Sequence, residues 1–215
     1  MKFTFITIFP ELINDFCKEG LLAKAIRTKK IQVDTINPRD FTKDIHQTVD
    51  DAPYGGGEAG MIMKIEPLAA AIRKAVGKKQ AKTTLVVLLS PSKQIFNQQM
   101  AVKWTKLKHL VLICGRYEGV DARIEKYVDA KISLGEFVVM GGEVAGLTIL
   151  EAVSRLLPGV IGHEVSLAEE SYSERFKLEY PHYTRPEIFA GLKVPKVLLS
   201  GNHQKIKEWR KKHSK

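Results

Sequence analysis

Cysteine and long apolar runs are the two features that this sequence most clearly lacks. Cys17 and Cys114 are the only cysteines among 215 residues. They exclude a disulfide framework, and their spacing matches no metal-ligand pattern. No apolar run approaches the roughly 20 residues that a membrane-spanning helix needs, and the apolar segment 3–9 is too short for a signal sequence. We therefore expect a cytoplasmic protein without a membrane partner.

The positive charge of the chain is unevenly distributed. Apolar residues at 44% and charged residues at 27% are ordinary for a globular protein, but the net charge is +10. Residues 193–215 hold eight lysines or arginines and a single acid, Glu208. A basic block of this kind is typical of a surface that binds phosphates, and a merely solvated tail is the alternative.

Strands and helices alternate along the first 160 residues. Strands are predicted at 3–8, 31–36, 84–89 and 109–114, and helices at 11–27, with a break at Gly20, at 66–76 and at 97–107. This order indicates an α/β fold, with a mostly parallel sheet and flanking helices. From about residue 159 the chain is polar and rich in glutamate, and residues 202–212 predict one basic amphipathic helix. We therefore divide the chain into a domain at 1–158, a linker or lid at 159–181 and a short helical segment at 182–215.

The segment 133–143 carries the clearest functional signal. Its apolar run 137–139 stands between Gly135 and the pair Gly141-Gly142, which predicts a strand between two glycine corners, followed by a helix. Two ordinary tight turns are the alternative. The strands 84–89 and 109–114 also end in turn-forming residues. In open α/β sheets ligands bind at the carboxyl ends of strands, so we expect a pocket there.

Eight sequence blocks, in order along the chain, resemble one family. The blocks are VDDAPYGGG (49–57), LSP (89–91), CGRYEG (114–119) with Asp121 and Arg123, GGE (141–143), VSR (153–155), PGV (158–160), PHYTRP (181–186) and VLLSGNH (197–203). They resemble the bacterial tRNA (guanine-N1-)-methyltransferases, the TrmD family of the SPOUT superfamily. The resemblance implies a deep trefoil knot. It also implies S-adenosylmethionine-dependent methylation of N1 of the guanine immediately 3′ of the tRNA anticodon.

The same resemblance implies three cofactor loops, near residues 89–91, 115–119 and 134–142. The implied cofactor-binding residues are Leu89, Ser90, Pro91, Gly115, Tyr117, Glu118, Leu134, Gly135, Glu136, Phe137, Val138, Val139, Gly141 and Gly142. The implied substrate contacts are Asp50, Gly60, Ser171 and Arg185. Mg²⁺ is associated with the family's reaction and Glu118 is its candidate neighbour, but no ligand cluster in the sequence specifies a metal site.

Methylation of guanine N1 requires a base and a positive group. N1 carries a proton at neutral pH, and its removal shifts negative charge onto O6. The resemblance assigns the base to Glu170, where the family usually has aspartate, and the positive group to Arg155. Glu169 stands beside Glu170 as a competing base, and an ordinary surface pair between Glu151 and Arg155 is the alternative for the arginine. The resemblance further implies a homodimer whose composite active site sets Arg155 of one subunit against the linker of the other.

Three departures from the family keep two other functions open. These departures are Glu170, one extra residue at 58 or 59, and a sequence that ends at Lys215 where the family continues as several helices. The alternatives are a related knotted methyltransferase with another RNA target, and a catalytically silent RNA-binding scaffold. We favour guanine-N1 methylation of tRNA, and we expect RNA affinity to be the property that the departures affect most.

Overall fold

The chain divides into two compact units, Met1–Gly162 and His163–Lys215. The structure, a computed structural model, describes residues 1–56, 60–77, 81–161, 170–172 and 178–214. Among these residues no helix is long and apolar enough to cross a membrane.

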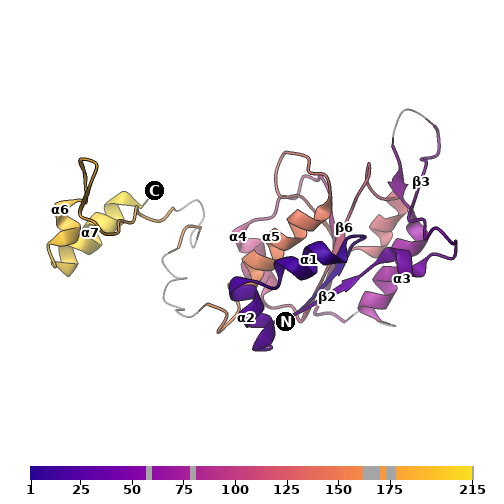
Figure 1. The fold of residues 1–215 in the computed structure, drawn as a ribbon, viewed down its shortest axis with the longest axis horizontal. Helices are drawn as coiled ribbons and strands as arrows, with labels where there is room; N and C mark the ends of the chain where they lie inside the picture. Colours follow the sequence, from indigo (N-terminus) through magenta and orange to yellow (C-terminus); the bar gives the residue numbers. More distant parts are fainter. Residues whose placement is uncertain (57–59, 78–80, 162–169, 173–177, 215) are drawn as a thin grey trace. The chain divides into compact units, whose positions relative to one another are not determined.

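Five parallel strands form the central sheet of the first unit, in the order β2-β1-β6-β5-β7 (Figure 1). Their bounds are β1 Lys2–Ile6, β2 Gln32–Ile36, β5 Thr84–Leu89, β6 His109–Cys114 and β7 Ala130–Ile132. Lys2 is in register with both Gln32 and His109, so β1 lies between β2 and β6. Strands β5 and β6 are almost wholly buried, as expected for apolar runs in a parallel sheet covered on both faces.

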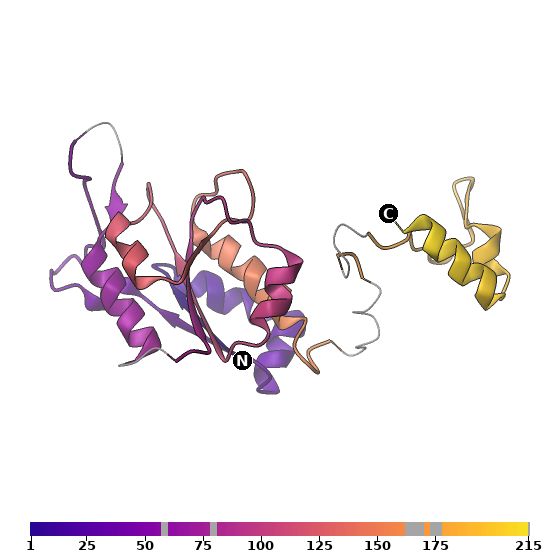
Figure 2. The ribbon, with the colours of Figure 1, turned by 180° about the vertical axis from the view of Figure 1, so that it is seen from behind.

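Helices cover both faces of this sheet (Figure 2). The helices are α1 Pro10–Phe16, α2 Gly20–Arg27, α4 Gln98–Trp104 and α5 Gly142–Ser154 on one face and α3 Ile65–Val76 on the other, with the 3-10 turns η1 Pro38–Phe41 and η2 Ala122–Tyr127. Successive side chains of β6 point to opposite faces of the sheet and so contribute to two hydrophobic cores. Leu110 and Leu112 pack under α5, and Val111 and Ile113 pack under α3. The predicted α/β class and its mostly parallel sheet are confirmed.

The helical stretch predicted at 11–27 forms two helices and is divided, as predicted, at Gly20, which adopts a left-handed φ of +63° at the start of α2. One predicted element differs from the structure. The strand expected at 137–139 is wrong: this segment is a loop after β7, and Val138 is 84% exposed. Its apolar side chains border a pocket instead of pairing in the sheet. A short hairpin, β3 Asp50–Asp51 with β4 Ile62–Met63, was not predicted.

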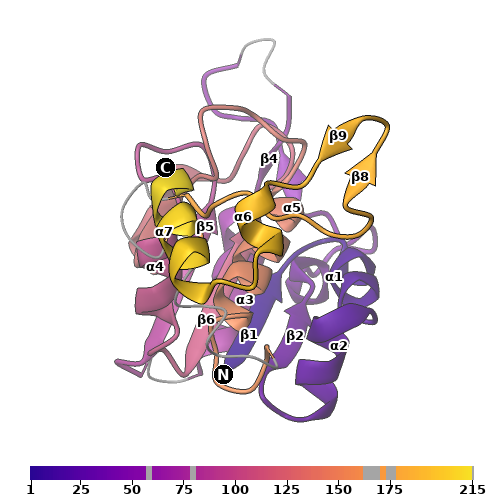
Figure 3. The same ribbon diagram turned by 90° about the vertical axis from the view of Figure 1, so that its left-hand side faces the viewer.

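The described part of the second unit contains a hairpin and two helices, drawn in yellow and orange in Figure 3. The elements are β8 Ile188–Phe189, β9 Leu192–Lys193, α6 Lys196–Leu199 and α7 His203–His213. The predicted basic helix at 202–212 is confirmed as α7, and the Asn202 side chain caps it by accepting from Lys205 N at 3.0 Å. The hairpin was not predicted. Its two-residue turn, Ala190-Gly191, has positive φ at both positions, as tight hairpins require.

His109, at the start of β6, makes the stability of the first unit dependent on pH. Burial lowers the pKa of His109, and the nearby positive charge of Lys2 lowers it further. The folded state therefore binds the proton more weakly than the unfolded chain, in which a histidine has a pKa of about 6.5. The stability contributed by neutral His109 is present above about pH 6.5 and is lost as the pH falls through the lower folded pKa.

We expect the urea midpoint of the wild-type protein to fall more than that of His109→Gln between about pH 7.5 and about pH 5. The glutamine can keep a hydrogen bond to Thr4, whose Oγ1 lies 2.8 Å from His109 Nε2, but it cannot titrate. An equal fall in both proteins would assign the acid sensitivity to other groups.

Candidate active site

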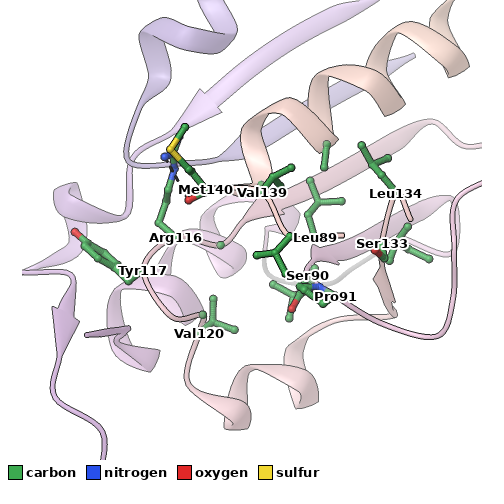
Figure 4. A pocket seen from close by; sticks show the side chains of 18 of the residues that line it. Leu89, Ser90, Pro91, Arg116, Tyr117, Val120, Ser133, Leu134, Val139 and Met140 are labelled. Atoms are coloured by element: carbon green, nitrogen blue, oxygen red, sulfur yellow. Dashed lines mark hydrogen bonds between the residues drawn. The ribbon is translucent and has the colours of Figure 1, made fainter. Parts of the chain in front are cut away.

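A pocket lies at the carboxyl ends of three adjacent strands, as the sequence predicted (Figure 4). The loop after β5 contributes Ser90 and Pro91, the loop after β6 contributes residues 115–120, and the loop after β7 contributes most of residues 133–142. The ends of β5, β6 and β7 are 25 and 18 residues apart in the sequence. Because the strands are parallel, the loops that follow them meet at one edge of the sheet.

Twelve of the fourteen residues assigned to the cofactor line this pocket. The exceptions are Gly135 and Glu136. Glu136 is exposed, and Gly135 packs behind the Phe137 ring, where a Cβ would approach to 2.6 Å. Lining residues that the resemblance did not assign are Leu88, Arg116, Gly119, Val120, Ile132, Ser133, Met140 and Ala145. Most of them stand inside or beside the predicted loops, so their position in the sequence was the available signal.

The outer rim of the pocket is apolar and exposed. Phe137, Val138, Val139 and Met140 follow one another here, and Met140 is 90% exposed. Consecutive exposed apolar side chains over a pocket are typical of a binding site rather than of ordinary surface. The rim can therefore cover an apolar or aromatic part of a ligand.

Gly142 brings helix α5 against the backbone of β6. Its N–H donates to Gly115 O at 2.9 Å, and a Cβ at this position would lie 2.7 Å from Cys114 Cα. At Gly141 a Cβ would overlap the Arg116 side chain. The pair of glycines therefore closes the inner wall of the pocket with main chain. A larger residue at 142 would require the backbone to move, and one at 141 would require the Arg116 side chain to move.

A buried ion pair joins three parts of the site. Arg116 Nε donates to Glu143 Oε2 at 2.8 Å, and Thr7 Oγ1, just beyond β1, donates to Glu143 Oε1 at 2.7 Å. The Arg116 guanidinium also lies 4.6 Å from the ring centre of Phe9 and is 3.5 Å from Met140 O. Glu143 is 1% exposed, so these partners replace the water that its carboxylate loses on burial. The network ties the end of β1, the loop after β6 and the apolar rim to the start of α5.

We expect Arg116→Met to reduce the free energy of unfolding by about 3 kcal/mol, because it leaves the Glu143 carboxylate buried without a cation. Arg123→Met is the matched control. Arg123 also pairs with a carboxylate, Asp121, but its side chain is 64% exposed, and such pairs contribute less than about 1 kcal/mol. Urea denaturation of both variants measures the difference in the free energy of unfolding. Similar losses of stability in the two variants would mean that the buried pair contributes no more than the exposed one.

The predicted substrate and catalytic residues lie in both units. Gly60 packs against Glu118, since its Cβ position is 3.1 Å from Glu118 Cγ, and Asp50 lies in the adjoining β3–β4 hairpin. Met63 N donates to Gly119 O at 2.9 Å, so this hairpin borders the pocket loop after β6. Arg155 follows α5 in the first unit.

The other assigned residues, Glu170, Ser171 and Arg185, belong to the second unit. Ser171 Oγ accepts from Glu179 N at 3.0 Å, and Arg185 is exposed. Glu169, the competing base, lies outside the described residues. The two assigned catalytic residues are therefore carried by different units of the chain.

Neither a metal cluster nor an activated thiol is present among the described residues. They bring together no group of three His, Cys, Asp or Glu side chains. Cys114 ends β6, and burial raises its pKa well above the ordinary value, so the thiol stays protonated at neutral pH. The described pocket therefore suits a ligand held by apolar contacts and main-chain groups.

Comparisons with known proteins agree with this geometry. A family profile described as tRNA (Guanine-1)-methyltransferase TrmD matches residues 1–215. The tRNA (guanine-N(1)-)-methyltransferase of Carboxydothermus hydrogenoformans is 49% identical over 215 residues, covering 100% of this chain and 83% of that protein. Its counterpart in Chloroflexus aggregans is 50% identical over 212 residues, covering 98% and 82%.

Among solved structures, the crystal structure of tRNA (m1G37) methyltransferase from Aquifex aeolicus matches with a TM-score of 0.81 and 38% identity. The match covers 99% of this chain and 88% of that one. The similarity in sequence and in structure therefore spans both units.

Proposed function

The chain belongs to the tRNA (guanine-1)-methyltransferase family TrmD, and from this membership we infer that it is an enzyme that methylates N1 of guanine in tRNA. S-adenosylmethionine is the methyl donor, and the target is the guanine immediately 3′ of the anticodon. The observation that carries this proposal is the set of residues that line the pocket at the ends of β5, β6 and β7. It gathers twelve residues, assigned from the family's motifs, at the carboxyl edge of the sheet.

The pocket fits the methyl donor by the chemistry of its lining. Leu134 and Val139 offer apolar walls for a flat adenine ring, and the glycine-lined inner wall leaves main-chain N–H and C=O groups accessible to its polar edge. Phe137 and Met140 would cover the ligand from outside. S-adenosylmethionine brings an electrophilic methyl group on a sulfonium, so the protein need supply no covalent nucleophile.

The protein's part in the chemistry is to move a proton and to stabilise charge. Glu170 accepts the N1 proton of guanine, and Arg155 stabilises the negative charge that develops on O6. Because Glu170 and Arg155 belong to different units, their meeting at one substrate requires the second unit, of the same chain or of a partner chain, to approach the first. Asp50, Gly60, Ser171 and Arg185 contact the tRNA in this proposal.

A homodimer with a composite active site is supported by an exposed apolar face on the first unit. The side chains of Leu12 and Phe16 on α1, Leu21 on α2 and Val144 on α5 are each at least 43% exposed. Helices α1 and α5 pack together, so these side chains belong to one region of the surface. Exposed apolar clusters of this kind are typical of protein–protein interfaces.

Several further assignments follow from family membership and complete the proposal. Residues 1–158 fold as a knotted SPOUT domain, residues 159–181 form the linker and residues 182–215 contact tRNA. The enzyme acts in the cytoplasm. Mg²⁺ finds no built site among the described residues, since Glu118 is a single exposed carboxylate. An ion there would need most of its ligands from substrate and water.

A methyl-transfer assay with labelled S-adenosylmethionine tests the proposal. The substrates are a tRNA with guanine immediately 3′ of the anticodon and the same tRNA with adenine at that position. We expect transfer to the guanine tRNA only. Methyl groups at another nucleotide would favour the related methyltransferase. Cofactor binding without any transfer would favour the silent RNA-binding scaffold.

A further inference from the structure

The amino-terminal edge of the sheet, opposite the cofactor pocket, carries a row of lysines. A lysine stands at or within two residues of the start of each of four neighbouring strands: Lys30 before β2, Lys2 in β1, Lys108 before β6 and Lys82 before β5. Because the strands are parallel and lie about 4.8 Å apart, these residues fall side by side along one edge. We call these four residues and Lys29 the lysine row.

Main-chain hydrogen bonds hold the lysine row in place. The amino terminus donates to Lys30 O at 3.0 Å, Lys2 N donates to Lys108 O at 2.8 Å and Lys108 N donates to Thr83 O at 3.0 Å. Figure 3 shows the amino terminus at the edge where β1 begins. Hydrogen bonds between neighbouring strands therefore fix the spacing of the main chain at Lys2, Lys30 and Lys108.

Few acids balance these charges. Lys2, Lys82 and the segments 24–34 and 103–108 together contain nine lysines or arginines and one acid, Asp34. Asp34 pairs with Lys2 Nζ at 2.9 Å, and among the described residues no ion pair involves Lys29 or Lys108. The remainder of residues 1–162 carries 14 basic and 16 acidic residues. The positive charge of the first unit is thus concentrated at this edge.

A shallow cavity opens beside the lysine row. The amino-terminal residue, Lys2, Lys29 and Lys108 line it, its floor includes Ile26 and Leu107, and no acid contributes to its lining. Lysines in such a setting act as point charges for phosphate, and an apolar floor suits the sugar or base between phosphates.

We propose that the lysine row is a second RNA-binding surface, and that its occupant is the phosphodiester backbone of tRNA outside the reacting nucleotide. Strands of five or six residues set the row roughly 20 Å from the cofactor pocket. A tRNA carries a phosphate at every nucleotide, so a substrate anchored at the pocket presents many phosphates farther along its length. The identity of the RNA rests on the proposed function, whereas the anionic class of the ligand rests on the row alone.

The test compares two double variants that remove the same charge. Lys29→Gln/Lys108→Gln removes two of the five charges of the row, and Lys74→Gln/Lys126→Gln removes two exposed charges on α3 and η2. All four side chains are exposed, so the substitutions leave the core unchanged. The affinity for a tRNA transcript is measured over a range of KCl concentrations, together with kcat, the KM for tRNA and the Kd for S-adenosylmethionine.

We expect the row variant to bind tRNA about five- to tenfold more weakly at about 100 mM KCl, with the slope of log K against log salt reduced by about one to two. Its cofactor Kd and its kcat at saturating tRNA stay at wild-type values, and the control variant changes tRNA affinity less than about twofold. Equal effects of the two double variants would overturn the inference, as would a lower kcat with unchanged tRNA affinity. Weaker tRNA binding by the row variant, in a protein that transfers no methyl group, would support the row and refute the proposed function.

Discussion

Replacing Glu170 by glutamine is expected to lower kcat for methyl transfer by about a hundred- to ten-thousandfold, the usual contribution of a general base. The amide keeps the size of the side chain but cannot accept the N1 proton. Binding of S-adenosylmethionine should stay at the wild-type level, because Glu170 belongs to the second unit and the pocket to the first. Single-turnover kinetics with saturating tRNA and cofactor measure the effect on chemistry directly.

Glu169→Gln is the matched control, since it removes the same charge one residue earlier. We expect it to keep kcat within about threefold of wild type, because only one carboxylate can lie within hydrogen-bond reach of N1. Arg155→Ala should lower kcat by about a hundred- to a thousandfold through loss of charge stabilisation. If Glu169→Gln inactivated the enzyme and Glu170→Gln did not, the base would be Glu169.

Gly142→Ala is expected to weaken S-adenosylmethionine binding by about a hundredfold and to lower the free energy of unfolding by about 1–3 kcal/mol. The new methyl group would meet Cys114 Cα at 2.7 Å and Gly115 N at 3.0 Å, and both are main-chain atoms that cannot turn aside. Helix α5 would have to move away from β6, and Glu143 would move with it, away from Arg116. Calorimetric titration and urea denaturation measure the two losses.

Gly115→Ala is the control for stability. A Cβ at Gly115 meets only Leu89 O and Val120 Cγ1, each at 3.5 Å, which is an ordinary contact distance. We expect the free energy of unfolding to change by less than about 1 kcal/mol, because an alanine without strain also reduces the entropy of the unfolded chain. If Gly142→Ala were as stable as Gly115→Ala, the close approach of α5 to β6 would not matter for stability.

The sheet and the site loops could be predicted from the sequence because their signals are local. Strands β5 and β6 are uninterrupted apolar runs that end in turn-forming residues, and a parallel sheet brings such ends together. The same apolar signal misled at 137–139. An apolar run that borders a ligand pocket has the same composition as a buried strand. The two differ only in that the pocket segment pairs with no neighbouring strand, which the sequence does not reveal.

The Arg116–Glu143 pair could not be predicted because its partners are brought together only by the fold. Thr7 and Glu143 stand 136 residues apart, and nothing in the sequence near either one indicates the other. The lysine row has the same origin. Lys2, Lys30, Lys82 and Lys108 are scattered along the chain, and the strand order makes them neighbours. The roles of Glu170 and Arg155 stay predictions, because they depend on how the two units meet.

The position of β1 between β2 and β6 has a consequence for synthesis on the ribosome. β2 can pair with β1 early, but β6 ends only at Cys114. At translation rates of about 5–20 residues per second, β6 is completed roughly 5–20 s after β1. During that interval the nascent β1–β2 pair exposes an apolar edge with unpaired main-chain groups, a form prone to aggregation. We therefore expect the nascent chain to depend on chaperones until the sixth strand has emerged from the exit tunnel.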